Sequence, residues 1–127
     1  GAAHPRAAVA GMTRQQLVAR PIAGKWSTLE VVCHLADFDP VLVDRMKRIL
    51  AYGKDVPLLL IADENLYLSA LKYHERDAEE ELAVIDSTRR QMARVIRALP
   101  KSLAIPKSKT LSLPFSVSII FAGLMSR

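Results

Sequence analysis

Apolar residues recur at three- and four-residue steps in two stretches of the chain, and a helix-capping pattern precedes each stretch. The first starts at Ser27, where the hydroxyl and the Glu30 carboxylate can each accept a hydrogen bond from the other residue's backbone amide. The second starts at Asp77, with Glu80 three residues later, and ends before Pro100. The pattern predicts helices over about residues 27–52 and 77–99.

The same spacing predicts which side of each long helix is buried. In the first helix the predicted apolar face consists of Val31, Leu35, Phe38, Leu42, Met46 and Ile49. In the second it consists of Leu82, Ile85, Met92, Val95, Ile96 and Leu99. Pro40 interrupts the first pattern, so we expect a kink near Ala36–Asp39, and Gly53 is expected to end that helix.

Three weaker helical segments accompany the long ones. His4 to Ala10 has room for about two turns between Pro5 and Gly11. Thr13 and Gln16 form a second capping-box pattern. Asp63 to Tyr73 is compatible with a helix that places Leu66, Ala70 and Tyr73 on one side. These segments predict an all-α fold.

The sequence changes character after Pro100. Apolar residues occupy positions 111, 113, 115, 117 and 119, which is the period of a half-buried strand, and Pro114 would restrict such a strand to an edge. A lone strand has no partner in a helical domain. We therefore expect a helical domain over residues 1–100 and a tail over 101–127 that pairs with its own copy in a dimer or forms an extended apolar arm.

Composition and charge narrow the class of protein. The length of 127 residues fits one domain, and no apolar run reaches the roughly 18 residues that a membrane-spanning helix needs. The single cysteine, Cys33, is compatible with a reducing cytoplasm. Of the net charge of +5, residues 101–127 contribute four lysines and arginines and no acid. Because the rest of the chain has no basic stripe, we do not expect nucleic-acid binding.

One segment carries a family resemblance. The stretch from Gly24 to Asp37, Gly-Lys-Trp-Ser-Thr-Leu-Glu-Val-Val-Cys-His-Leu-Ala-Asp, resembles the DinB/YfiT-like superfamily, as do Asp44-Arg45 and the Tyr73-x-x-Arg-Asp77 turn. The resemblance covers about residues 11–100. It implies a four-helix bundle, often dimeric, in which three histidines hold a divalent ion such as nickel or zinc. It also implies thiol-linked transferase or isomerase chemistry.

Only His34 matches a ligand position of that family. The resemblance implies two further ligands from an H-x-x-x-H pair on the last helix, yet no histidine follows His74. The first helix is also shorter than the resemblance implies. We therefore expect an incomplete DinB-like bundle with a short first helix and with its last helix replaced by the tail.

Each candidate residue also has a plain structural interpretation. His34 is either a remnant of a metal site or an ordinary core histidine, and Asp37 one turn later could add only a second ligand. Cys33 points about 100° away from its neighbour His34, so we expect a buried thiol rather than a catalytic pair. The expectations for the others are a capping role for Glu30, a staple-like packing role for Trp26, exposure for His74, disorder for His4, and a solvated face for Arg89, Arg90, Arg94 and Arg97.

Two functions remain open at this stage. The first is a non-catalytic, cytoplasmic helical homodimer that has lost its metal and has no catalytic residue. The alternative is a metal-dependent, thiol-linked transferase or hydrolase whose nickel or zinc site is completed from elsewhere, for example across a dimer. Only His34 is a candidate metal ligand, and the small-molecule substrate is not specified by the sequence.

Overall fold

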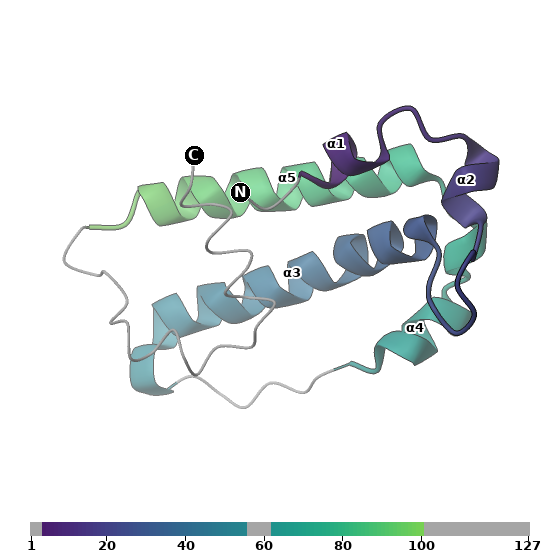
Figure 1. The fold of residues 1–127 in the computed structure, drawn as a ribbon. Helices are drawn as coiled ribbons and strands as arrows, with labels where there is room; N and C mark the ends of the chain where they lie inside the picture. The colour runs from purple at the N-terminus through teal and green to yellow at the C-terminus, as the bar shows by residue number, and fades with distance from the viewer. Residues whose placement is uncertain (1–3, 56–61, 101–127) are drawn as a thin grey trace.

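A computed structural model describes residues 4–55 and 62–100. All regular structure in this part of the chain is helical, as predicted, and none of its helices is both long and apolar enough to cross a membrane. The predicted tail and its strand-like segment lie outside the described residues. The elements, in chain order, are α1 (Pro5–Val9), α2 (Arg14–Val18), α3 (Thr28–Tyr52), η1 (Gly53–Asp55), α4 (Glu64–Ala70), η2 (Tyr73–Glu75) and α5 (Ala78–Arg97) (Figure 1).

The capping patterns set the helix starts. Ser27 accepts from the Glu30 amide at 3.1 Å and donates its own amide to the Glu30 carboxylate at 2.7 Å, so both halves of the predicted box form. Thr13 and Gln16 form the same box at the start of α2. At Asp77 only the first half forms, with the carboxylate accepting from the Glu80 amide at 3.0 Å. The predicted bounds of both long helices are confirmed to within two residues.

Two backbone positions decide where helices end. Gly53, with a φ of 60°, follows α3 as predicted. The predicted helix Asp63–Tyr73 was too long, because Lys72 adopts a left-handed φ of 49° and the helix stops at Ala70. Pro40 does not end α3, which continues as a helix past it to Tyr52.

The buried face of α5 is confirmed, whereas of the face predicted for α3 only Met46 is buried. Leu82, Ile85 and Met92 of α5 are buried. On α3, however, Val31 is 44 % exposed, and the buried apolar side chains are Leu29, Val32, Cys33, Ala36, Val43 and Met46. Both stripes of α3 are apolar, but the second contains the small residues Cys33 and Ala36. Val32 and Ala36 pack against Leu82 and Ile85 of α5, whereas Cys33 packs with Leu17, Leu29 and Tyr73.

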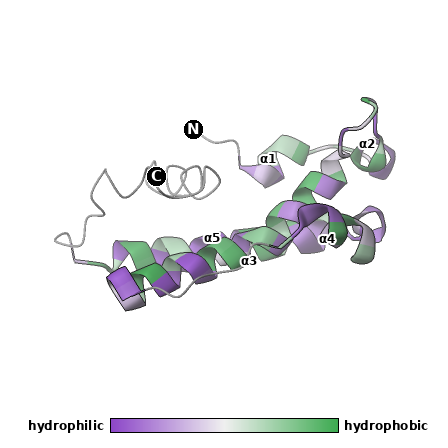
Figure 2. Ribbon diagram, turned by 90° about the horizontal axis from the view of Figure 1, so that it is seen from below, coloured by the Kyte–Doolittle hydropathy of each residue, from purple (hydrophilic) through white to green (hydrophobic). Residues whose placement is uncertain are grey.

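Helices α3 and α5 run in the same direction (Figure 1). The core shows this by its order: Val32 and Ala36 pack with Leu82 and Ile85, while further along Val43 and Met46 pack with Met92. Both helices therefore start at one end of the molecule and finish at the other. Viewed from below, hydrophobic and hydrophilic residues alternate around both helices (Figure 2).

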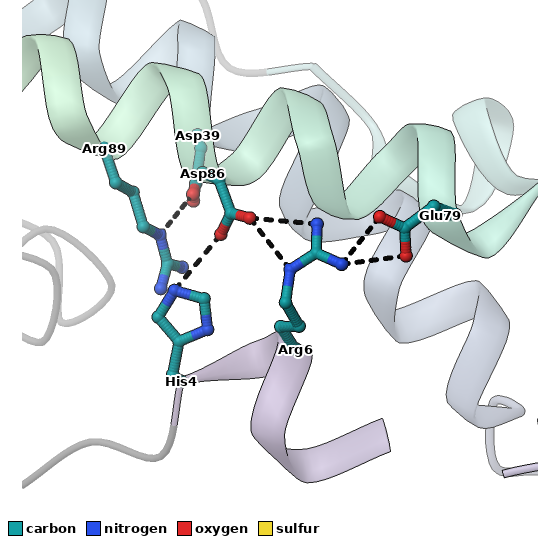
Figure 3. A network of polar contacts seen from close by, with 6 residues as sticks. All are labelled: His4, Arg6, Asp39, Glu79, Asp86 and Arg89. Atoms are coloured by element: carbon teal, nitrogen blue, oxygen red, sulfur yellow. Dashed lines mark hydrogen bonds and ion pairs between the residues drawn. The ribbon is translucent and has the colours of Figure 1, made fainter. Parts of the chain in front are cut away.

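The start of the chain is fastened to α5 by charge. Arg6 of α1 contacts the Asp86 and Glu79 carboxylates, at 3.0 Å and 2.6 Å, and His4 Nε2 lies 3.1 Å from Asp86 (Figure 3). The expectation that His4 is disordered was therefore wrong. Helix α1 is therefore held against α5 by Arg6, which reaches two acids on the same side of α5.

The expectation of a fully solvated arginine face on α5 was also wrong for Arg89. Its side chain is 25 % exposed, and its Nε donates to the Asp39 carboxylate at 2.6 Å (Figure 3). Asp39 is 2 % exposed and lies on the buried stripe of α3. A buried carboxylate requires a partner, and Arg89 is placed to supply it. Arg90, Arg94 and Arg97 are exposed, as predicted.

Candidate functional site

His34 lies in the second turn of α3, where the Ser27 cap fixes the helix start. Its imidazole is 25 % exposed and is surrounded by aromatic rings. Trp26 meets it edge-on with ring centroids 5.3 Å apart, and Phe38, one turn further along α3, lies at 4.6 Å. Phe38 in turn packs against Tyr67 of α4 at 5.0 Å. The candidate site is therefore largely apolar.

The two nitrogens of His34 differ in their surroundings. Nε2 lies 3.5 Å from Oε2 of Glu64, an exposed residue in the first turn of α4. Nδ1 is buried and has no hydrogen-bond partner in the part of the chain that the structure describes. The imidazole thus has one weak carboxylate contact and one unpaired nitrogen, and it is held mainly by aromatic packing.

Trp26 anchors the start of α3, as predicted, but by a different contact. A hydrophobic staple would pair Trp26 with Val31, the fourth residue of the helix. Val31 is 44 % exposed, and the indole packs against His34 instead. The tryptophan therefore forms one wall of the candidate site.

Asp37, the second possible ligand on α3, is bound by Arg76. Each oxygen of its carboxylate accepts a hydrogen bond of 2.8 Å from one terminal nitrogen of the guanidinium. The same guanidinium reaches the Glu81 carboxylate of α5 through Nε at 2.8 Å and Nη2 at 2.5 Å. Arg76 therefore links α3, the turn before α5 and α5 itself, and engages both oxygens of Asp37.

Burial and charge shift the pKa values of this group. Burial would raise the pKa of Asp37, but the hydrogen bonds from Arg76 outweigh it and hold that pKa below its usual range. The hydrogen bonds to Asp37 and Glu81 raise the pKa of Arg76. Tyr73, fully buried below the guanidinium at 5.2 Å, has its pKa raised by burial and by the neighbouring Asp37. At neutral pH Asp37 is therefore ionised, Arg76 is charged and Tyr73 is neutral.

Cys33 lies beside the buried Tyr73 and not beside His34. The thiol is fully buried, and Sγ donates to the Tyr73 carbonyl at 3.6 Å. Burial raises its pKa to about 11, so it is protonated at neutral pH. The prediction of a buried thiol is confirmed.

Glu30 acts as the cap residue that the sequence predicted. Its carboxylate is 2 % exposed and, besides the Ser27 amide, it bonds the Arg20 guanidinium. Burial alone would raise the pKa of Glu30, and the bonds from Arg20 and Ser27 lower it instead. His74, by contrast, is 65 % exposed, as predicted, with Nε2 3.5 Å from its neighbour Glu75.

These residues do not fit a catalytic metal ion. Such an ion needs about three protein ligands, and only His34 and Glu64 approach one another at the candidate site. Among residues 4–55 and 62–100, no three His, Cys, Asp or Glu side chains are grouped to hold an ion. The remaining 1–3, 56–61 and 101–127 contain none of these four residue types. Further ligands would have to come from outside this chain.

Two contacts that depend on tertiary structure were not predicted from the sequence. Glu64 was not assigned a place near His34, and Arg76 was not paired with Asp37. A signal for the second pair was present, since Asp37 closes the motif and Arg76 lies in the Tyr-x-x-Arg-Asp turn. Two oppositely charged residues in separate motif segments are candidates for an ion pair.

Comparison with known families gives one match. A model described as the DinB superfamily matches residues 5–117. The match begins before the region of motif similarity and extends beyond Pro100 into the following segment. No curated protein and no solved structure matches the chain.

Proposed function

This chain belongs to the DinB superfamily, and from that premise we propose that it is a non-catalytic, helical member without a three-histidine metal site. The observation that supports this most directly is the environment of His34. Its imidazole packs against Trp26 and Phe38, with only Glu64 in reach. Arg76 engages Asp37, the acid one turn away. These contacts suit a structural histidine better than a metal ligand.

The alternative is a metal-dependent, thiol-linked transferase or hydrolase whose ligands are completed by a second molecule. One observation favours it: the imidazole is partly exposed and Nε2 faces a carboxylate, which is a common arrangement around metal ligands. It requires at least one further ligand from outside this chain. In that case the metal would be nickel or zinc and would bind only to an assembled form.

Metal titration of the full chain separates these functions, with His34→Ala as the test variant and His74→Ala as its control. His74 is a matched control because its Nε2 also lies 3.5 Å from a glutamate oxygen, but on the exposed surface. We expect nickel or zinc to bind at well below one equivalent, equally in both variants, by calorimetry and by metal content after desalting. One equivalent that is lost only in His34→Ala would establish the alternative.

A homodimer in the cytoplasm completes the proposal. The described residues bury only a small set of apolar side chains, because α1 and α2 have five residues each and cover little of the two long helices. A second copy would add buried surface to this limited core. Cys33, a buried free thiol with no partner for a disulfide, fits a reducing compartment.

A further inference from the structure

The parallel arrangement of α3 and α5 gives the molecule an acidic end and a basic end. Residues 62–86, which lead into and begin α5, contain eight acids against Lys72 and Arg76. Residues 87–100 contain four arginines and no acid. Arg45, Lys47 and Arg48 lie in the second half of α3, which ends beside that of α5. Both helix dipoles favour this distribution, since each has its negative end at the basic end of the molecule.

Four arginines at the basic end form no ion pair with an acidic side chain of the described residues, namely Arg45 of α3 and Arg90, Arg94 and Arg97 of α5. All 13 acidic side chains of the sequence lie in the described residues. Asp39 binds Arg89, and Asp44 binds Arg48. Arg90, Arg94 and Arg97 form no ion pair with any acidic side chain. At the other end Glu80 is exposed, and its carboxylate is likewise unpaired within the described residues.

Two of the unpaired charges, Glu80 and Arg94, lie on one exposed stripe of α5. Glu80, Ser87 and Arg94 are spaced seven residues apart, which places them in line on a helix. All three are exposed, as are Ala83 and Gln91 between them, on the side away from the buried Ile85 and Met92. The middle of the stripe has the small side chains Ala83 and Ser87. A second helix could approach closely there.

We infer that this stripe binds the α5 helix of a second copy in antiparallel orientation, with the two-fold axis beside Ser87. Glu80 of each copy then faces Arg94 of the other, because the two residues are equally far from Ser87. Parallel pairing would instead place glutamate against glutamate and arginine against arginine. This inference rests on the homodimer of the proposed function and identifies the surface that forms it.

A second copy fits this stripe better than an acidic macromolecule does. A polyanion along α5 would be attracted by Arg94 but repelled by the exposed, unpaired Glu80. A copy of the same helix matches the charge at both ends at once. Such pairs are exposed and screened by ions, so the association should weaken as salt rises.

Charge-swap variants of the full chain test the register. We expect Glu80→Arg and Arg94→Glu each to raise the dimer dissociation constant by about tenfold or more, because symmetry turns two attractions into two repulsions. The double variant, or an equimolar mixture of the two single variants, should restore association. Sedimentation velocity at about 0.05 M and about 0.5 M salt measures this, and circular dichroism confirms that each variant is folded. Lys54→Glu, an equal charge change at the basic end outside α5, is the matched control.

The outcomes separate this inference from the proposal on which it rests. A dimer that responds to the α5 variants no more than to Lys54→Glu, or that the mixture does not restore, overturns the α5 surface and leaves the homodimer intact. A wild-type chain that stays monomeric overturns both. If that monomer binds heparin through Arg94, an acidic partner replaces the second copy. A chain that stays monomeric would also have no second copy to complete a metal site.

Discussion

Two regions lie one helical turn apart on α3 and have opposite chemistry. Around His34 the neighbours are aromatic rings, Nδ1 has no hydrogen-bond partner among residues 4–55 and 62–100, and one carboxylate lies at 3.5 Å. Around Arg76 every oxygen of Asp37 and Glu81 is engaged at 2.5–2.8 Å. The first region contains the histidine by which the family motif suggests metal chemistry. The second region contains the shorter polar contacts of the two, those of Arg76 with Asp37 and Glu81.

The difference shows that the polar residues near the motif serve the fold. Asp37 closes the motif in sequence, yet its carboxylate points to the turn before α5 rather than to His34. Arg76 joins Asp37 of α3, which is distant in sequence, to Glu81 in the first turn of α5, whereas His34 contacts its surroundings mostly through ring packing. Stability should therefore depend strongly on Arg76 and weakly on His34. Three predictions test that contrast.

The largest expected effect comes from Arg76→Met. Removing the guanidinium leaves Asp37 and Glu81 partly buried without a counter-charge, which should cost about 2–4 kcal/mol of unfolding free energy after allowance for partial exposure. Urea unfolding at a fixed protein concentration measures it. Arg90→Met, on the exposed side of α5, is the control and should change stability by less than about 0.5 kcal/mol. Equal losses in the two variants would mean that the Arg76 network is not a stabilising centre.

Acid should have an intermediate effect. The folded-state pKa values of Asp37 and Glu30 are lowered, so their contribution is complete above the unfolded-state pKa and is lost as pH falls through the lowered values. The urea midpoint should therefore decline from about pH 5 downward. Arg76→Met should show a shallower decline, because Asp37 no longer has its partner. Parallel pH profiles in the two proteins would contradict this assignment.

The smallest effect is expected for His34→Phe. The substitution removes an unpaired buried nitrogen and keeps a ring between Trp26 and Phe38, so stability should change by no more than about 1 kcal/mol in either direction. The measurement is the same urea titration, run beside Arg76→Met. A loss as large as that of the arginine variant would show that the imidazole makes bonds essential to the fold.

Local sequence signals predicted the helices well and the packing less well. Capping residues such as Ser27 and Asp77 act within one turn, so the positions at which α3 and α5 begin could be predicted from neighbouring residues. The buried face of α3 could not, because two adjacent stripes of that helix are apolar. The choice between them depends on tertiary contacts: Val32 and Ala36 pack on α5, and Cys33 packs with Leu17 and Tyr73.

At the candidate site, too, local features could be predicted from the sequence and tertiary contacts could not. His34 and the buried state of Cys33 were predictable from the motif and from helix geometry. The contacts of Arg76 with Asp37, and of His4 with Asp86, join residues 39 and 82 positions apart, and no periodicity reports on such distances. The resemblance to the family motif therefore identified the histidine, but it did not predict the ionic contacts around its helix.

The parallel direction of α3 and α5 also has a consequence for how the chain folds. Antiparallel neighbours can form from one tight turn, but here residues 53–77 must lead the chain back before Leu82 can meet Val32. The chain must close that loop before the main helix pair gains any contact energy, and the entropy of loop closure opposes this step. Folding should accordingly be slower than for an antiparallel helical hairpin of equal size, with each helix appearing before the pair docks.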